Sequence, residues 1–117
     1  MKYIIDMIED IRENIQNSED YKLLAILLKV DEQNNPQNAG EKPITSFYLD
    51  HDAKQLHLGF LDENATTKEL LDCVNSLDMD SMMYEVMLKI SDEHPLMNVI
   101  GFGENHEQKE YVFFVST

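Results

Sequence analysis

Residues 82–90 read MMYEVMLKI, and this stretch decides the fold class. Every second position from Met82 to Ile90 is apolar or aromatic, which is typical of a β-strand with one buried face. We therefore expect one strand over the whole of Met82–Ile90, and a sheet that supplies its neighbours.

Five further segments are predicted to be strands of that sheet. Short apolar or aromatic runs indicate strands at Ile44–Leu49, Leu56–Leu61, Val99–Gly103 and Tyr111–Val115. The nearly continuous apolar run Tyr21–Val30 fits either a buried strand or a second helix, because periodicity does not separate the two. We favour a strand there, since the strands that follow need a neighbour.

Two helices complete the predicted fold. Ile4, Ile8, Ile11 and Ile15 recur at spacings of four, three and four, which places them on one helical face. Thr66–Glu69 reads as a capping box that starts a second helix reaching about Leu77. We expect a single α+β domain over residues 1–117, with two helices packed on a mainly antiparallel sheet of about six strands. The order is helix, three strands, helix, three strands.

One segment is predicted to lie outside regular structure. Residues 31–43 are polar and contain two prolines and a glycine, which favours a mobile, solvated loop.

Charge is the most unusual property of the composition. The 117 residues include 23 Asp and Glu but nine Lys and Arg, a formal net charge of −14. Direct binding to nucleic acid or to an anionic membrane requires basic residues and is disfavoured. The complementary partners are basic proteins. Solubility alone is the plainer explanation of so many acids, and charge by itself does not separate the two.

The sequence also bears on compartment and chemistry. One cysteine, Cys73, and no long apolar segment favour a cytoplasmic protein. Acidic neighbours in a helix make Cys73 a poor nucleophile. His51 lies between Asp50 and Asp52, but a solvated turn is the better explanation than a metal site. We expect no enzymatic activity, no metal and no cofactor.

The acids form close sets on a folded body instead of one acidic tail. Carboxylates two residues apart on a strand lie ~7 Å apart, and helical neighbours lie ~5–6 Å apart. DNA carries one charge per ~3.4 Å on each strand, so such a surface approximates part of a phosphate lattice. We expect the partner-binding residues to be Asp50, Asp52, Asp62, Glu63, Asp78, Asp80, Asp92, Glu93, Glu104, Glu107 and Glu110.

Two functional classes fit such a surface. One is a DNA mimic that occupies the DNA-binding site of a basic protein. The alternative is an acidic immunity protein or antitoxin that inhibits a basic nuclease. An enzyme or metal-binding domain is the third class, and no residue constellation supports it.

A resemblance favours the first class. The opening Met1–Asp10 and the ending Tyr111–Val115 resemble small neisserial DNA-mimic proteins that bind the histone-like protein HU. The resemblance covers the full length but transfers no residue pattern. It implies a non-enzymatic protein, which we expect to be a monomer, that modulates DNA binding by HU and is associated with the nucleoid through that partner.

Overall fold

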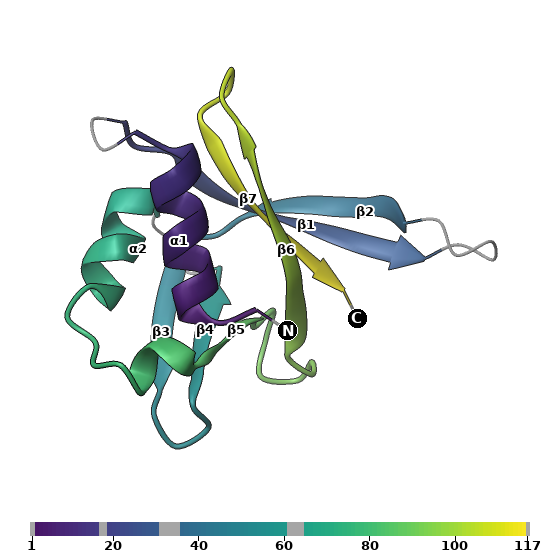
Figure 1. Cartoon of the computed structure of the whole chain (residues 1–117). Helices are drawn as coiled ribbons and strands as arrows, with labels where there is room; N and C mark the ends of the chain where they lie inside the picture. The colour runs from purple at the N-terminus through teal and green to yellow at the C-terminus, as the bar shows by residue number, and fades with distance from the viewer. Residues whose placement is uncertain (1, 17–18, 31–35, 61–64, 117) are drawn as a thin grey trace.

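The computed structural model describes residues 2–16, 19–30, 36–60 and 65–116. The first half holds helix α1 and four strands: α1 (Ile4–Asn14), β1 (Lys22–Val30), β2 (Pro36–Pro43), β3 (Ser46–Asp50) and β4 (Gln55–Gly59). The second half holds helix α2, a 3₁₀ turn η1 and three strands: α2 (Thr67–Val74), η1 (Ser81–Met83), β5 (Glu85–Leu88), β6 (Met97–Asn105) and β7 (Glu110–Ser116). Both helices lie on one side of the sheet (Figure 1).

The sheet curls because of its connection between β2 and β3. These strands follow each other in the chain but occupy the two edges of the order β2-β1-β7-β6-β5-β4-β3. The three Cα steps between them cover at most about 11 Å. Ile44 N donates to Leu23 O at 3.0 Å, and the next residue, Thr45, donates to Gly59 O at 2.9 Å. The two edges therefore converge, and the sheet forms a half-barrel.

The predicted sheet of about six mainly antiparallel strands is wrong. Within the described residues the sheet has seven strands and is mixed, because β1 pairs with β7 and β4 pairs with β5 in parallel. Parallel neighbours need a long crossover between them, and α2 and η1 supply it for β4 and β5. Periodicity reports which side chains are buried, but it does not report which strands pair.

The additional strand is β2, where the sequence predicted a loop over residues 31–43. Residues 31–35 lie outside the described part of the chain, whereas Pro36–Pro43 forms the strand. Proline lacks a backbone donor and is tolerated on an edge strand, and both prolines stand at the ends of β2. Because an edge strand tolerates polar residues, the composition of β2 resembled that of a loop.

The strand predicted over Met82–Ile90 is shorter than its alternation suggested. Residues Ser81–Met83 form η1, and β5 contains only Glu85–Leu88. Within β5 the alternation identified the core-facing residues Val86 and Leu88, each 1% exposed, but Met87 on the opposite face is also buried, at 7% exposed. The prediction of a strand at Tyr21–Val30 is confirmed by β1.

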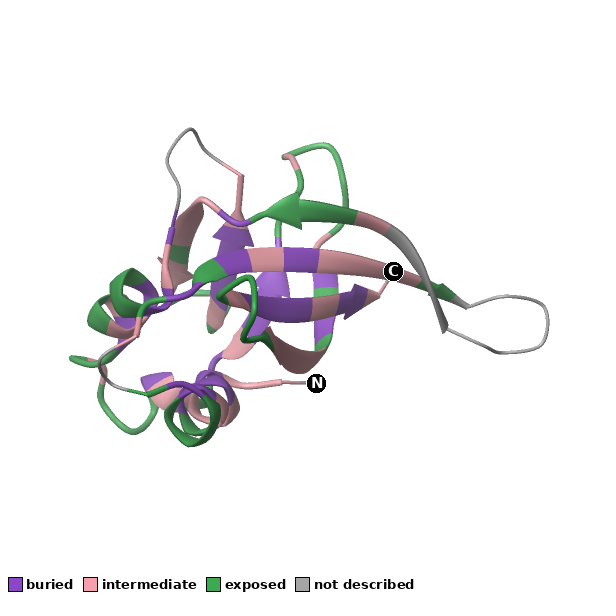
Figure 2. Cartoon of the chain, turned by 90° about the horizontal axis from the view of Figure 1, so that it is seen from above, coloured by how far each residue is buried: buried purple, intermediate pink, exposed green. Residues whose placement is uncertain are grey.

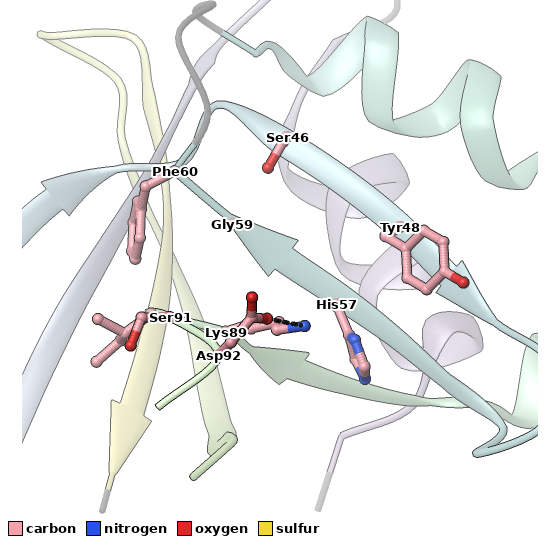
Figure 3. Close-up of a pocket in the computed structure, with 9 residues that line it drawn as sticks. Ser46, Tyr48, His57, Gly59, Phe60, Lys89, Ser91 and Asp92 are labelled. Atoms are coloured by element: carbon pink, nitrogen blue, oxygen red, sulfur yellow. Dashed lines mark ion pairs between the residues drawn. The ribbon is translucent and has the colours of Figure 1, made fainter. Parts of the chain in front are cut away.

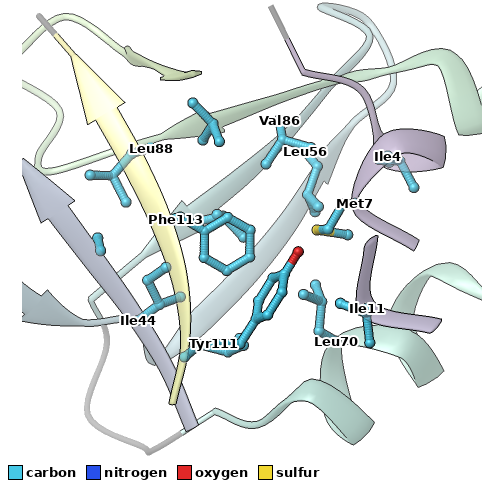
Figure 4. Packing of buried hydrophobic residues seen from close by; sticks show 14 of the residues in the cluster. Ile4, Met7, Ile11, Ile44, Leu56, Leu70, Val86, Leu88, Tyr111 and Phe113 are labelled. Atoms are coloured by element: carbon cyan, nitrogen blue, oxygen red, sulfur yellow. The ribbon is translucent and has the colours of Figure 1, made fainter. Parts of the chain in front are cut away.

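The face of the sheet that the helices cover holds the core. Helix α1 buries Ile4, Met7, Ile8 and Ile11 against it. Asp6 accepts a hydrogen bond from Tyr3 N at 2.9 Å and so fixes the start of α1. Figure 4 shows Ile4, Met7 and Ile11 of α1 on the same side as Leu70 of α2, facing Tyr111 and Phe113 of β7 and Leu56 and Val86 of the central strands. Each large apolar side chain buried here contributes roughly 1.5–3 kcal/mol.

Helix α2 begins as predicted but ends at Val74 instead of Leu77. The Thr66 hydroxyl accepts from Glu69 N at 3.4 Å. Asp20 also stabilises the start of α2, because its carboxylate accepts from Lys68 N and from the Thr67 hydroxyl, both at 3.1 Å. Figure 2 shows exposed residues gathered on the outer sides of the helices and at the turns. Among the described helices, none has the length and apolar character that crossing a membrane requires.

Candidate interaction surfaces

Four predicted site residues gather where the β3–β4 turn meets the segment before η1. We call this group, Asp50, Asp52, Asp78 and Asp80, the turn end. The two segments are joined by His51, whose Nδ1 lies 2.9 Å from the Tyr84 hydroxyl and whose ring meets the Tyr84 ring edge-on. Glu85 N also donates to Lys54 O at 3.2 Å. Acids that are about 30 residues apart in the chain therefore belong to one surface.

The acids of the turn end divide into structural and displayed groups. Asp50 accepts from Ala53 N at 3.0 Å, and Asp78 accepts from Ser81 N at 2.8 Å. The hydrogen bonds from Ser81 lower the pKa of Asp78, and the nearby His51 adds to the effect. Asp78 is therefore ionised at neutral pH. Asp52 and Asp80 are exposed and are the displayed acids of this group.

Asp92 and Glu93 lie in the connection between β5 and β6. The Lys89 ammonium pairs with the Asp92 carboxylate at 3.0 Å, but the Asp92 side chain is 93% exposed. Such a surface pair contributes between zero and about 1 kcal/mol, so it is easily exchanged for a partner's cation. Glu93 is also exposed.

The third predicted set lies at the β6–β7 hairpin, beside the C-terminal half of α1. We call Asp10, Glu104, Glu107 and Glu110 the hairpin end. Tyr3 and Ile4, at the start of α1, contact Glu85 and Tyr84 near the turn end, so the two groups lie at opposite ends of this helix. Figure 1 shows the β6–β7 turn at the top and the β3–β4 turn at the bottom.

Glu104 was predicted to be a partner-binding residue, and the structure makes it a poor one. It pairs across the sheet with Tyr111, a fully buried residue, so its side chain lies on the core face of β6. Burial, followed by the hydrogen bond and the charge of Asp10, raises the pKa of Glu104 from 4.5 to about 7. Glu104 therefore holds its proton over most of the range below pH 7.

Asp10, which is not among the eleven predicted partner-binding residues, organises this site. Its Oδ2 accepts from the Tyr111 hydroxyl at 2.7 Å, and its Oδ1 accepts from Asn14 Nδ2 at 3.1 Å. Burial and Asp10 both raise the pKa of Tyr111, so this hydroxyl keeps its proton and remains a donor. No local signal marks the contact, because Asp10 and Tyr111 are 101 residues apart in the chain.

The outcome for the eleven predicted acids is mixed. Asp62 and Glu63 lie outside the described residues. Asp50, Glu104 and Glu110 are half-buried, and the remaining six are exposed: Asp52, Asp78, Asp80, Asp92, Glu93 and Glu107. Apart from Glu41, the described acids make one ion pair with a described Lys or Arg, which is Lys89–Asp92. Most of the displayed charge is therefore not neutralised within the described part of the chain.

Catalysis or metal binding would depend on the Cys, His, Asp and Glu side chains. Burial raises the pKa of the Cys73 thiol, so burial and not the neighbouring acids weakens it as a nucleophile. Within the described ranges, His, Cys, Asp and Glu side chains do not gather in threes in a way that would hold a metal ion.

A pocket of about 480 Å³ lies on the face of β3 and β4 that is turned away from the helices (Figure 3). It is lined by Ser46, Tyr48, His57, Gly59, Phe60 and residues 89–92. No sequence signal marks this pocket, because its walls come from segments whose patterns indicate only strands and turns.

Comparison with known proteins gives no match. No family model, no curated protein and no solved structure matches the chain. The half-barrel and its acidic surfaces define the chain only as an acidic α+β protein with exposed carboxylates at its turns. The functional proposal therefore rests on the residues of this chain.

Proposed function

We propose that this protein is a DNA mimic. Its exposed carboxylates occupy the DNA-binding surface of a basic DNA-binding protein, histone-like HU, and so modulate that protein's binding to DNA. The observation that carries the proposal is the set of exposed acids held at fixed turns and largely without internal Lys or Arg partners. In this proposal the protein acts in the cytoplasm as a monomer and reaches the nucleoid through its partner.

The structural support is rigidity combined with charge. Asp50 and Asp78 hold their own turns by accepting backbone hydrogen bonds, while Asp52 and Asp80 beside them face solvent. A carboxylate held on an ordered turn loses less conformational entropy when it meets a partner's cation than one on a disordered tail. A protein that binds phosphates with Lys and Arg meets similar partners on this surface.

The test is competition for DNA. A fluorescent duplex bound to HU is titrated with the protein, and fluorescence anisotropy reports the release of the duplex. Release is expected at close to stoichiometric protein concentration in about 0.1 M salt. Direct binding of the protein to HU, measured without DNA because salt also releases the duplex, should weaken strongly toward 1 M, where the screening length falls from ~10 to ~3 Å. A duplex that stays bound at the lower salt concentration contradicts the proposal. Stoichiometric inhibition of a basic nuclease, without an effect on HU, indicates the alternative class.

Two sets of variants locate the interface. The test variant neutralises four exposed acids at turns: Asp52→Asn, Asp80→Asn, Glu93→Gln and Glu107→Gln. The matched control removes the same charge from exposed helix positions: Glu9→Gln, Glu13→Gln, Glu69→Gln and Asp72→Asn. The turn variant is expected to need about tenfold more protein for release, and the control much less than that. A larger loss in the control would place the interface on the helices.

A further inference from the structure

The pocket on the outer face of β3 and β4 combines apolar walls with a buried polar group. Because alternate residues of a strand face opposite sides, His57 points away from the core that Leu56 and Leu58 enter. Figure 3 shows His57 and Tyr48 on one side of the pocket and Phe60 on the other. Its volume of about 480 Å³ is within the range of sites that bind a ligand or a partner's side chain.

His57 is the unusual residue of this pocket. It is 8% exposed, and its Nε2 lies 2.9 Å from the Gln55 Oε1. Since a carbonyl oxygen only accepts, Nε2 carries the proton and Nδ1 is an acceptor. Nδ1 is buried and has no hydrogen-bond partner among the described residues. Burial also lowers the pKa of His57, so the ring is neutral at pH 7. A small rotation toward a donor in the pocket would therefore give the ring a hydrogen bond that it lacks.

The walls of the pocket expose large apolar groups. Tyr48 is 64% exposed and Ile90 is 36% exposed, and the Tyr48 ring lies 6.1 Å from the His57 ring. Ile90 also lines a neighbouring hollow of about 230 Å³ together with Pro95 and Leu96. Ile90 therefore joins two hollows into one continuous apolar surface, and such surfaces mark interaction sites.

The rim of the pocket is acidic. Asp92 and Glu93 are exposed beside it, and Asp50 is close enough to His57 to favour the charged form of the ring. Two lysines lie nearby. Lys89 is paired with Asp92 at 3.0 Å, and Lys42 Nζ lies 4.5 Å from the centre of the Phe60 ring, one wall of the pocket. An occupant that carries cations next to an apolar group matches this arrangement, whereas an anion meets the field of the whole chain.

We propose that this pocket receives one aromatic side chain from a basic polypeptide, whose flanking Lys and Arg face Asp50, Asp92 and Glu93. The inference deepens the proposed function and rests on it, since it gives the basic partner an anchor that salt does not screen. An aromatic ring offers the largest apolar contact at a low cost in side-chain entropy.

The test uses two acetylated and amidated tetrapeptides instead of the natural partner. One has the sequence lysine–arginine–phenylalanine–lysine, and the other has alanine in place of phenylalanine. Both are titrated into ¹⁵N-labelled protein and followed by NMR. The phenylalanine peptide is expected to bind about tenfold more tightly. It should shift the amide signals of Gly59, Lys89 and Ser91 and the imidazole nitrogen signals of His57. The ratio of the two affinities should persist when salt weakens both peptides.

Variants separate the pocket from general charge. Tyr48→Ala removes an exposed wall of the pocket. In this variant the affinity for the phenylalanine peptide is expected to fall to that for the alanine peptide. Met83→Ala is the matched control, because Met83 is 57% exposed but lies in η1, outside the pocket. The control should bind like the unchanged protein. Equal binding of the two peptides, or shifts confined to other surfaces, would overturn the inference.

The outcomes for the pocket and for the proposed function are distinguishable. Tight release of DNA from HU together with equal peptide affinities leaves DNA mimicry standing and removes the pocket. A preserved peptide preference without any release of DNA keeps the pocket and removes DNA mimicry. An uncharged acetylated phenylalanine amide that binds as tightly as the phenylalanine peptide would show a small-molecule site, which also overturns the inference.

Discussion

The turn end and the hairpin end carry similar numbers of acids but treat their charge in opposite ways. At the turn end, backbone hydrogen bonds lower the pKa of Asp78, and Asp52 and Asp80 face solvent. At the hairpin end, burial raises the pKa of Glu104 to about 7 beside Asp10. The formal charge of the sequence is therefore an upper bound on the charge that the protein displays. The turn end is the better candidate surface for a basic partner.

Several substitutions compare the stability of the hairpin end with that of the turn end. Among them, Tyr111→Phe should have the largest effect on the free energy of unfolding. It removes the hydroxyl that donates to Asp10 at 2.7 Å in a fully buried position. Hydrogen bonds to charged groups contribute roughly 1.5–3 kcal/mol, and we expect a loss of about 2 kcal/mol at pH 8, measured by urea unfolding.

Tyr84→Phe is its matched control at the turn end. The Tyr84 hydroxyl lies 2.9 Å from His51 Nδ1, and His51 is exposed, so water can replace this bond. The expected loss is below about 1 kcal/mol. Equal losses in the two variants would show that the Asp10 site is not special and would remove the contrast between the ends.

The substitution Glu104→Gln tests the raised pKa of Glu104 by its effect on how stability depends on pH. The folded state holds the Glu104 proton up to about pH 7, whereas the unfolded chain releases it near 4.5. Folding is therefore favoured by this group at low pH, and the unfolding free energy falls as pH rises through about 7. Glutamine does not titrate, so the variant should gain stability relative to the unchanged protein between pH 5 and pH 8. We expect about 1–2 kcal/mol, after allowing for the partial exposure of the site.

Glu107→Gln provides the control for this measurement. Glu107 belongs to the same hairpin but is exposed. Its variant should follow the unchanged protein across the same pH range, as seen in urea midpoints at pH 5 and pH 8. A gain of the same size in both variants would indicate a general relief of charge repulsion, and the raised pKa of Glu104 would lose its support as the cause.

Local patterns predicted the parts of the fold that depend on one segment at a time. The isoleucine spacing identified α1, and the apolar run identified β1, because each reports the burial of a single element. Strand order and the parallel pairs were not predicted, since they depend on the half-barrel that closes at Ile44 and Thr45. Edge strand β2 was missed because polar residues and prolines suit an edge as well as a loop.

The candidate site was predictable to a similar degree. Exposure was correct for acids at turns, such as Asp52 and Glu107, because turns are solvated. It failed for Glu104, since the strand expected to end at Gly103 continues to Asn105. An irregularity between Val99 and Gly101 resets the alternation, so Glu104 shares the core face with Phe102 and Tyr111. A sequence pattern gives no warning of such a shift.

The smallest of the expected effects compares two acids within the turn end. Asp78 accepts from Ser81 N at 2.8 Å and is ionised, whereas Asp80 is exposed two residues later and has no side-chain cap bond. Asp78→Ala removes this cap bond and should lower the urea midpoint, whereas Asp80→Ala should leave the midpoint nearly unchanged. Both are read from urea midpoints at pH 7.

Binding should not separate the same two variants, although stability does. Each removes one negative charge from one surface, so the release of DNA from HU should weaken by a similar factor in both, provided that Asp78→Ala is assayed well below its unfolding midpoint. A loss of release in Asp78→Ala alone would mean that the order of the turn matters more than its charge. A loss in Asp80→Ala alone would identify Asp80 as the acid that meets the partner, and Asp78 as the residue that holds Asp80 in place.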